Sequence, residues 1–356
     1  RRYVAEFVEA RDRGAPRIPG LDAEPGSISG PIRCAEDSEW SYYLYLPEDF
    51  HDGRLWPVWF VMSPGGGKGG GALRRYVEGA ERWGCVLALS VESKNHFADS
   101  DLAIEAMVED VYERVPVAED LALASGMSGG SRMAYWLAEV DRDIAGVLAC
   151  GSGKGIYLKA DSDRYREAEL RGSTYVYSLI GTNCFNRTGA FQSHDTFPDD
   201  YRLRFFPGGH AWAGAGLIAE GMGRVLGAGL ERYRDGDARL MREQFARAAW
   251  EWTSANVASR PWEAHYWADY LEDFPGPGEI QADAMRLARD LKDAPKVRAA
   301  RRAERDIRRF AEEYFDVFYK VDKKANPDRR READRLADRY PGIPHGELLR
   351  RLGDSS

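Results

Sequence analysis

Leu121-Ala-Leu-Ala-Ser-Gly-Met-Ser-Gly-Gly-Ser-Arg-Met133 is the stretch that decides the fold. Its apolar start predicts a buried strand, and the residues from Ser131 onward predict a helix. Between them, Gly126-Met-Ser-Gly-Gly130 matches G-x-S-x-G, the pattern of a sharp strand-to-helix turn that exposes a serine hydroxyl on a strained backbone. Ser128 is therefore the candidate nucleophile, and a glycine-rich turn with an incidental serine is the alternative.

The sequence around the same turn leads to two further expectations. We expect Gly126 and Gly129 to stand where a Cβ would clash with a neighbouring strand or helix. The N-terminus of the following helix points at Ser128, so its free N–H groups favour developing negative charge. The rest of the chain must then supply an oxyanion hole, a histidine and an acid.

Strand and helix patterns alternate from residue 39 to residue 229. This alternation predicts a mostly parallel sheet with helices on both faces, which is an α/β fold. The expected strands are 39–47, 57–62, 85–90, 121–125, 144–150, 174–180 and 201–206, and the expected helices are 73–83, 101–114, 131–140 and 214–229.

The pattern changes to helix only beyond about residue 232. Its tryptophans are too many to leave in water, so this region packs on itself, on the sheet domain, or on both. We divide the chain into an N-terminal arm (1–31), a catalytic domain (32–232) and an all-helical C-terminal domain (233–356). The expected C-terminal helices are 240–257, 263–271, 279–292, 296–321, one from Pro327 and a short one after Pro344.

Composition narrows the class of protein. The 356 residues are 44% hydrophobic, enough for a sizeable core, and no apolar run approaches the length of a membrane-spanning helix. The net charge of −8 argues against a general nucleic-acid binder. Residues 291–356 carry 18 Lys and Arg against 13 Asp and Glu, which we interpret as a solvated helical surface.

His210 is the candidate base. Active groups gather at the C-terminal ends of parallel strands, and His210 follows the last expected strand closely, in Phe205-Phe-Pro-Gly-Gly-His210. Serine needs such a base within hydrogen-bond reach. A structural loop histidine is the alternative.

The glycine-rich segment 65–71 follows strand 57–62. We interpret it as an oxyanion loop, in which the backbone N–H of Gly66 joins that of Gly129 to bind a tetrahedral oxyanion. A phosphate-binding loop requires Ser or Thr after its lysine, whereas Lys68 is followed by Gly69.

Residues 38–230 resemble the α/β-hydrolase superfamily. They look most like its esterase-type branch, which contains polyhydroxybutyrate depolymerase-like and feruloyl or acetyl-xylan esterase-like enzymes. The resemblance implies hydrolysis of a small-molecule or polymer-derived carboxylic ester without a metal or organic cofactor. The matching residues are Tyr43-Leu-Tyr-Leu-Pro47, Gly65–Gly67, Gly126-Met-Ser-Gly-Gly-Ser-Arg-Met133, Ile144-Ala-Gly-Val147, Gly181-Thr-Asn-Cys-Phe-Asn-Arg187 and Pro207-Gly-Gly-His210.

Cys184 departs from that resemblance, because relatives usually carry the triad Asp at this position. Ser63-Pro64 is a second departure, since relatives usually have His-Gly before the oxyanion glycines. Three explanations remain open for the acid. It has moved to Asp161, Asp163 or Asp195; or a Ser–His dyad operates, with Asn183 orienting the ring; or catalysis is lost. A thiolate at Cys184 could also stabilise the imidazolium in part.

Cys150 ends one expected strand and Cys184 follows the next, so a disulfide between them is geometrically possible. Two buried free thiols are the alternative. The chain opens with Arg1, which favours a secreted or periplasmic location if a leader has been trimmed.

The sequence therefore predicts a serine esterase of α/β-hydrolase fold, with the helical domain as a hypothetical roof over the site. A peptidase or thioesterase remains open within this class. A catalytically impaired binding protein on the same fold is the rival. The sequence indicates neither the ester nor an oligomeric state.

Overall fold

The computed structural model describes residues 21–141, 143–154, 174–187, 189–190, 193, 201–234, 237–314 and 327–354. The chain forms two compact units. The first comprises Arg1–Leu179, Phe197–Arg202 and Trp212–Tyr233, and the second comprises Ile180–Thr196, Leu203–Ala211 and Arg234–Ser356. Residues 1–20 of the expected N-terminal arm lie outside the described residues.

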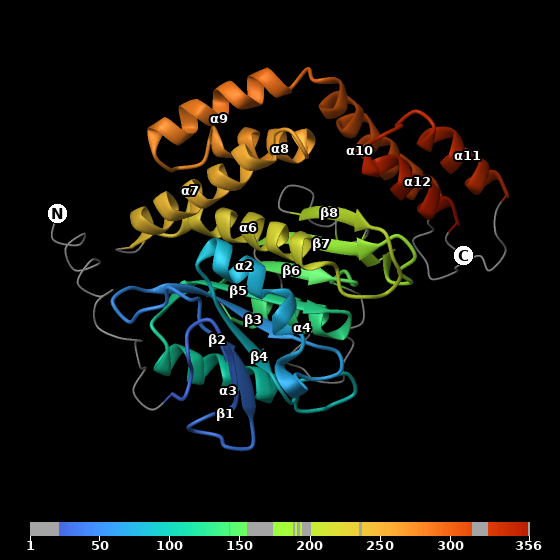
Figure 1. Ribbon diagram of the computed structural model, residues 1–356. Coiled ribbons are helices and arrows are strands. Elements are labelled where there is room, and N and C mark those ends of the chain that lie inside the picture. Colours follow the sequence, from blue (N-terminus) through green and yellow to red (C-terminus); the bar gives the residue numbers. More distant parts are fainter. Residues whose placement is uncertain are drawn as a thin grey trace. The chain divides into compact units, whose positions relative to one another are not determined.

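An eight-stranded mixed sheet forms the centre of the fold (Figure 1), in the order β1-β2-β4-β3-β5-β6-β7-β8. The strands β1 and β2 are antiparallel to their neighbours, whereas β4, β3, β5, β6 and β7 run parallel. Because consecutive parallel strands need crossover connections, helices must cover both faces. The strands are β1 (Ile28–Arg33), β2 (Ser41–Tyr45), β3 (Trp56–Met62), β4 (Val86–Ser90), β5 (Val117–Met127), β6 (Ile144–Cys150), β7 (Tyr175–Gly181) and β8 (Tyr201–Phe206).

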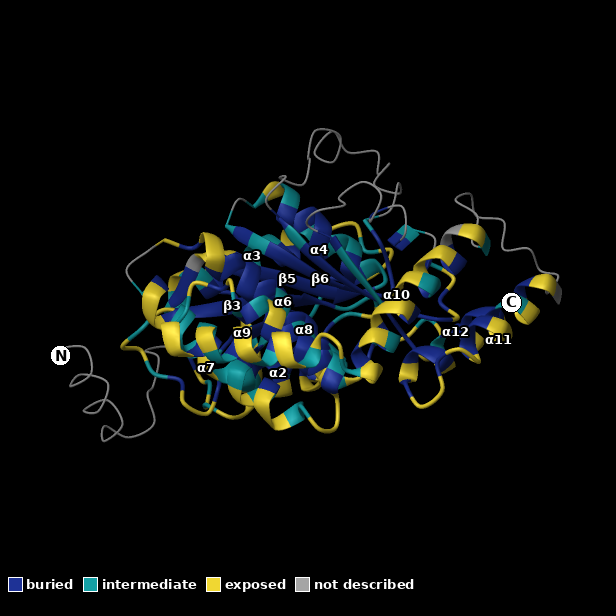
Figure 2. Ribbon diagram, turned by 90° about the horizontal axis from the view of Figure 1, so that it is seen from above, coloured by how far each residue is buried: buried dark blue, intermediate teal, exposed yellow. Residues whose placement is uncertain are grey.

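Helices pack on both faces of this sheet. Figure 1 shows α2 (Val77–Trp83) and α6 (Ala215–Arg232) on one face, and α3 (Ser100–Arg114) and α4 (Gly129–Val140) on the other. The strands between them are buried, as the dark blue of β3, β5 and β6 in Figure 2 shows. This arrangement confirms the α/β-hydrolase fold predicted from the sequence.

The N-terminal arm expected at 1–31 contains a strand that the sequence analysis missed. Residues Ile28–Arg33 form β1, which lies at the edge of the sheet and pairs with β2 alone. An edge strand tolerates Pro31, which lacks a backbone donor. Part of the segment expected as an N-terminal arm therefore belongs to the sheet.

The C-terminal part of the chain is helical, as predicted. Its elements are α7 (Ala238–Asn256), α8 (Pro261–Leu271), α9 (Gly278–Leu291), α10 (Pro295–Tyr314), α11 (Pro327–Ala337) and α12 (Pro344–Asp354). The helix expected at 296–321 is described as far as Tyr314.

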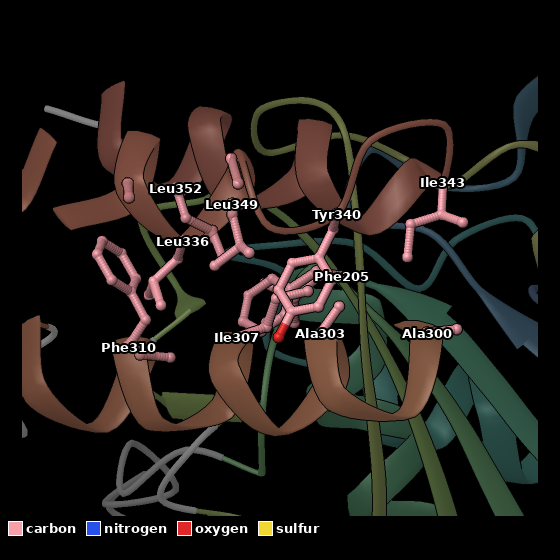
Figure 3. Packing of buried hydrophobic residues seen from close by; sticks show 14 of the residues in the cluster. Phe205, Ala300, Ala303, Ile307, Phe310, Leu336, Tyr340, Ile343, Leu349 and Leu352 are labelled. Carbon is pink, nitrogen blue, oxygen red and sulfur yellow. The ribbon is translucent and has the colours of Figure 1, made fainter. Parts of the chain in front are cut away.

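The last three helices enclose an apolar core of their own. Ile307 and Phe310 from α10 point toward Leu336 of α11 and toward Leu349 and Leu352 of α12 (Figure 3). The ends of β7 and β8 join this core through Ile180 and Phe205, and the segment after β7 joins it through Cys184 and Ala190. These segments group with the C-terminal helices in the second unit, whereas the sequence analysis assigns them to the catalytic domain.

Candidate active site

Ser128 occupies the strained turn between β5 and α4. Its backbone has φ 55° and ψ −116°, a region that non-glycine residues rarely adopt. Such a conformation costs about 1–3 kcal/mol and persists only where the surrounding structure enforces it. Ser128 is half-buried, with solvent access at the end of the strand.

Close backbone packing enforces this turn. A Cβ on Gly126 would overlap the carbonyl of Gly130 and lie 2.7 Å from Met62 O of β3. A Cβ on Gly130 would overlap the same Met62 oxygen. The glycine required by the neighbouring strand is therefore Gly130 rather than Gly129, whose Cβ would instead meet the side chain of Asn95.

Cys150 and Ser131 hold the turn from the other side. The Ser128 N–H donates to Cys150 O at 2.8 Å, and the Cys150 N–H donates to the buried Ser131 hydroxyl at 3.0 Å. The Cys150 thiol accepts the N–H of Ala213, three residues after His210, at 3.2 Å. Cys150 thus links the serine turn to the segment that begins α6.

The expected oxyanion loop lies directly after β3. The Gly66 N–H donates to Ser63 O at 3.1 Å, and the Gly67 N–H donates to Val91 O at 2.9 Å. Gly66 has φ +82°, and a Cβ there would lie 2.8 Å from Val91 O, so only glycine fits without strain. An oxyanion role for the Gly66 N–H requires it to exchange its turn bond for the substrate, and this role stays a prediction.

Asn95 is a residue that the sequence analysis missed. It follows β4 in a polar run, and no motif marks it. Its carboxamide fills the space beside the Cα of Gly129, the residue after the candidate nucleophile.

His210 and Cys184 lie together in the second unit. The Cys184 Sγ and the His210 Nδ1 are 3.1 Å apart. The loops that carry them are joined by backbone hydrogen bonds, from Thr182 N–H to Phe206 O at 2.9 Å and from Asn183 N–H to Gly208 O at 2.8 Å. The ring of Phe185, which is 63% exposed, lies over the imidazole at 4.0 Å between centroids.

The surroundings of Cys184 favour a protonated thiol. Its side chain is fully buried, and burial raises its pKa above the ordinary value of 9.0. The Asn186 N–H, 3.4 Å from Sγ, and the Arg187 guanidinium act in the opposite direction. The thiol is therefore neutral at neutral pH.

The other candidates for the acid are not brought to His210 by any described contact. Asn183 is exposed, and its backbone N–H donates to the histidine loop at Gly208 O. Asp161, Asp163 and Asp195 lie outside the described residues. The sequence allowed a disulfide between Cys150 and Cys184. That interpretation is wrong, because both residues are buried cysteines without a disulfide.

The described residues contain no group of three or more His, Cys, Asp or Glu arranged to hold a metal ion. None of the described helices has both the length and the apolar character needed to cross a bilayer.

No protein-family model matches the chain, and a search of curated proteins finds no match either. Solved structures of hydrolases resemble it. The S-formylglutathione hydrolase of Staphylococcus aureus is 14% identical over 52% of this chain and 92% of its own, with a TM-score of 0.40. A ferulic acid esterase of the anaerobic fungus Anaeromyces mucronatus is 14% identical over 61% of this chain and 96% of its own, with a TM-score of 0.42. A fluorophosphonate-binding serine hydrolase of Staphylococcus aureus is 13% identical over 52% and 92%, with a TM-score of 0.39.

Proposed function

We propose that this protein is a serine hydrolase that cleaves a carboxylic ester through an acyl-enzyme. The observation that carries the proposal is the backbone of Ser128, which holds a strained conformation at a strand-to-helix turn. Strain of this kind persists at reactive sites because the surrounding packing enforces it. The strand order of the sheet places such a turn at the carboxyl end of its central parallel strands.

In the proposed mechanism, the His210 Nε2 takes the proton of the Ser128 hydroxyl as the oxygen attacks the ester carbonyl. The oxyanion that forms accepts the Gly129 N–H at the start of α4, where the helix dipole also favours negative charge. His210 then gives its proton to the leaving alcohol. Water, activated by the same imidazole, hydrolyses the acyl-serine.

Chain connectivity supports the pairing of Ser128 with His210. The Ser128 N–H and the Ala213 N–H both donate to Cys150. His210 precedes Ala213 by three residues along the chain.

Cys184 takes the third position of the proposed triad. Its sulfur is the atom that contacts Nδ1, the ring nitrogen that the acid holds in a Ser-His-Asp triad. When Nδ1–H donates to Sγ, Nε2 keeps its lone pair and can act as the base. We therefore prefer a triad with a thiol over a relocated acid.

A fluorophosphonate probe tests the proposal, because it labels an activated serine covalently. We expect the wild type to be labelled, the Ser128→Ala variant not at all, and the His210→Ala variant at a rate reduced by about 10³ or more. The matched control is Ser93→Ala, which removes another buried serine of the same unit. If a folded wild type resists labelling, the chain is the rival, a non-catalytic binding protein.

A second experiment identifies which acyl and alcohol groups the enzyme accepts. A screen of p-nitrophenyl and aryl esters, with thioester and peptide substrates beside them, distinguishes esterase from thioesterase and peptidase activity. We expect the oxygen esters to be cleaved fastest.

A further inference from the structure

The segment after β4 is fixed to the oxyanion loop by backbone hydrogen bonds. Val91 O accepts the N–H of Gly67 at 2.9 Å, and the Asn95 N–H donates to Pro64 O at 2.9 Å. His96, the next residue, has φ +60°, which is costly for a side chain of its size. The position of Asn95 is therefore set by its backbone, at the expense of local strain.

The carboxamide of Asn95 lies against the residue that follows the candidate nucleophile. A Cβ built on Gly129 would overlap Oδ1 and would lie 2.8 Å from Cγ and 3.3 Å from Nδ2. The Asn95 side chain thus takes the volume that a side chain at position 129 would otherwise fill.

Neither core packing nor hydrogen bonding within the protein explains why a carboxamide stands at this position. Asn95 is exposed, so it does not serve to fill the core. Within the part of the chain that the structure describes, its Oδ1 and Nδ2 make no hydrogen bond to protein, and the bond that anchors the residue is made by its main chain. The carboxamide therefore lies beside Gly129 with Oδ1 nearest to it and Nδ2 farther away, and among the described residues neither Nδ2 hydrogen has a protein acceptor.

We propose that the Asn95 carboxamide is an additional catalytic donor, which hydrogen-bonds the substrate oxyanion that the Gly129 N–H also binds. This inference rests on the proposed function. A neutral amide is suited to the task, because it donates to a developing negative charge without stabilising the uncharged ester to the same degree. A half-turn of the carboxamide about χ2 presents either Nδ2 or Oδ1 to the site.

A variant series with a chosen p-nitrophenyl ester tests this inference. Removing one preorganised oxyanion donor lowers kcat by about 10²–10³ in the strongest cases. We expect Asn95→Ala to lower kcat at least tenfold with KM changed less than twofold, because the bond forms mainly in the transition state. Asn95→Asp should lower kcat further, because a carboxylate repels the oxyanion. The control Lys94→Ala alters an exposed neighbour in the same loop and should keep the wild-type rate.

A double variant tests the contact itself. Gly129→Ala should reduce kcat, because the new methyl group meets the carboxamide. Adding Asn95→Ala to Gly129→Ala removes that overlap, so the double variant should be less impaired than the product of the two single effects predicts.

The outcomes separate the two proposals. Wild-type kcat in both Asn95 variants, with activity abolished in Ser128→Ala, overturns the role of Asn95 and leaves the proposed function intact. A wild type that neither hydrolyses esters nor reacts with a fluorophosphonate overturns both.

Discussion

Cys184 gives the imidazole of His210 a partner without the charge of a carboxylate. Its thiol lies 3.1 Å from Nδ1, and burial raises the pKa of that thiol, so it is protonated at neutral pH. A thiol can accept Nδ1–H, or it can donate S–H to Nδ1 and leave the ring proton on Nε2. Only the first arrangement provides a base for Ser128. Because a carboxylate enforces that arrangement, we expect the wild type to be a slow hydrolase.

Replacing Cys184 by Asp should therefore increase activity. The carboxylate accepts Nδ1–H, fixes the productive tautomer and stabilises the imidazolium that forms in the transition state. The buried Arg187 guanidinium, which donates to Cys184 O at 3.4 Å, is available to offset part of the cost of burying the charge. We expect the rate of fluorophosphonate labelling at pH 7.5 to rise about tenfold, which corresponds to about 1.4 kcal/mol. Labelling of Cys184→Asp slower than that of Cys184→Ala would contradict this role for the position.

The pH dependence of activity distinguishes an electrostatic role of Cys184 from a merely structural one. The thiol is neutral below its raised pKa and becomes a thiolate above it, and the thiolate accepts Nδ1–H as a carboxylate does. The wild type should thus gain activity as the pH rises above 9.0, the ordinary value for a thiol. Cys184→Asp should show no such gain, because its carboxylate is already ionised. Cys184→Ala should also lack it.

At the scale of elements, α10, α11 and α12 share one core with the loop that carries Cys184. Phe310 of α10 is 1% exposed and belongs to the same cluster as Cys184 and Ala190. Figure 3 shows it beside Leu336 and Leu352. Packing of these helices thereby supports the loop that holds the partner of His210.

Phe310→Ala should destabilise this unit by about 3–5 kcal/mol, because truncating a buried aromatic side chain loses transfer free energy and leaves a cavity. Urea unfolding, followed by circular dichroism, measures the change. The matched control is Met285→Ala in α9, whose side chain is 55% exposed and should cost less than about 0.5 kcal/mol. Equal midpoints for the two variants would show that the cluster contributes little.

Elements with a clear period could be predicted from the sequence, whereas contacts between loops could not. The all-apolar run of β3 has the length of a strand, and the spacing of Ile307, Phe310 and Tyr314 favours a helix at α10. In contrast, β1 contains Gly30 and Pro31, and only its pairing with β2 makes it a strand. Asn95 reaches Gly129 because the loops after β3 and β4 are hydrogen-bonded together. No sequence pattern near Asn95 indicates that its side chain lies against Gly129.

The pairing of Cys184 with His210 was only partly predictable. Each residue follows a strand, so parallel topology predicts that they share one edge of the sheet. The sequence could not decide whether the thiol contacts His210 or bonds to Cys150, because both outcomes fit the spacing of neighbouring strands. The free thiols and the contact of Sγ with Nδ1 settle which atoms meet.

For the whole molecule, the boundary between the two compact units crosses β7 and β8. The chain passes from the first unit to the second after Leu179 and again after Arg202, within these strands. The residues after each strand, including Cys184 and His210, belong with the helices from Arg234 onward. The unit that contains the C-terminal helices therefore also contains residues from before position 233.

Truncation after Tyr233 should accordingly abolish activity rather than alter the substrate profile. Removing α10–α12 leaves Ile180, Cys184 and Phe205 without the apolar side chains that bury them. We expect the shortened chain to bind the dye ANS, to lose fluorophosphonate labelling and to aggregate. A soluble truncated protein that is labelled at the wild-type rate would show that the helices are dispensable, and a changed substrate profile in it would support the hypothetical roof.

This mid-strand boundary also constrains recombination. A hybrid gene with a single junction near residue 233 would combine one parent's helices with the other parent's histidine and cysteine loops, and their interior side chains would not match. A working chimaera has to exchange three stretches together, two of which begin inside strands. The helices from Arg234 onward would therefore have to be exchanged together with the two earlier stretches of the same unit.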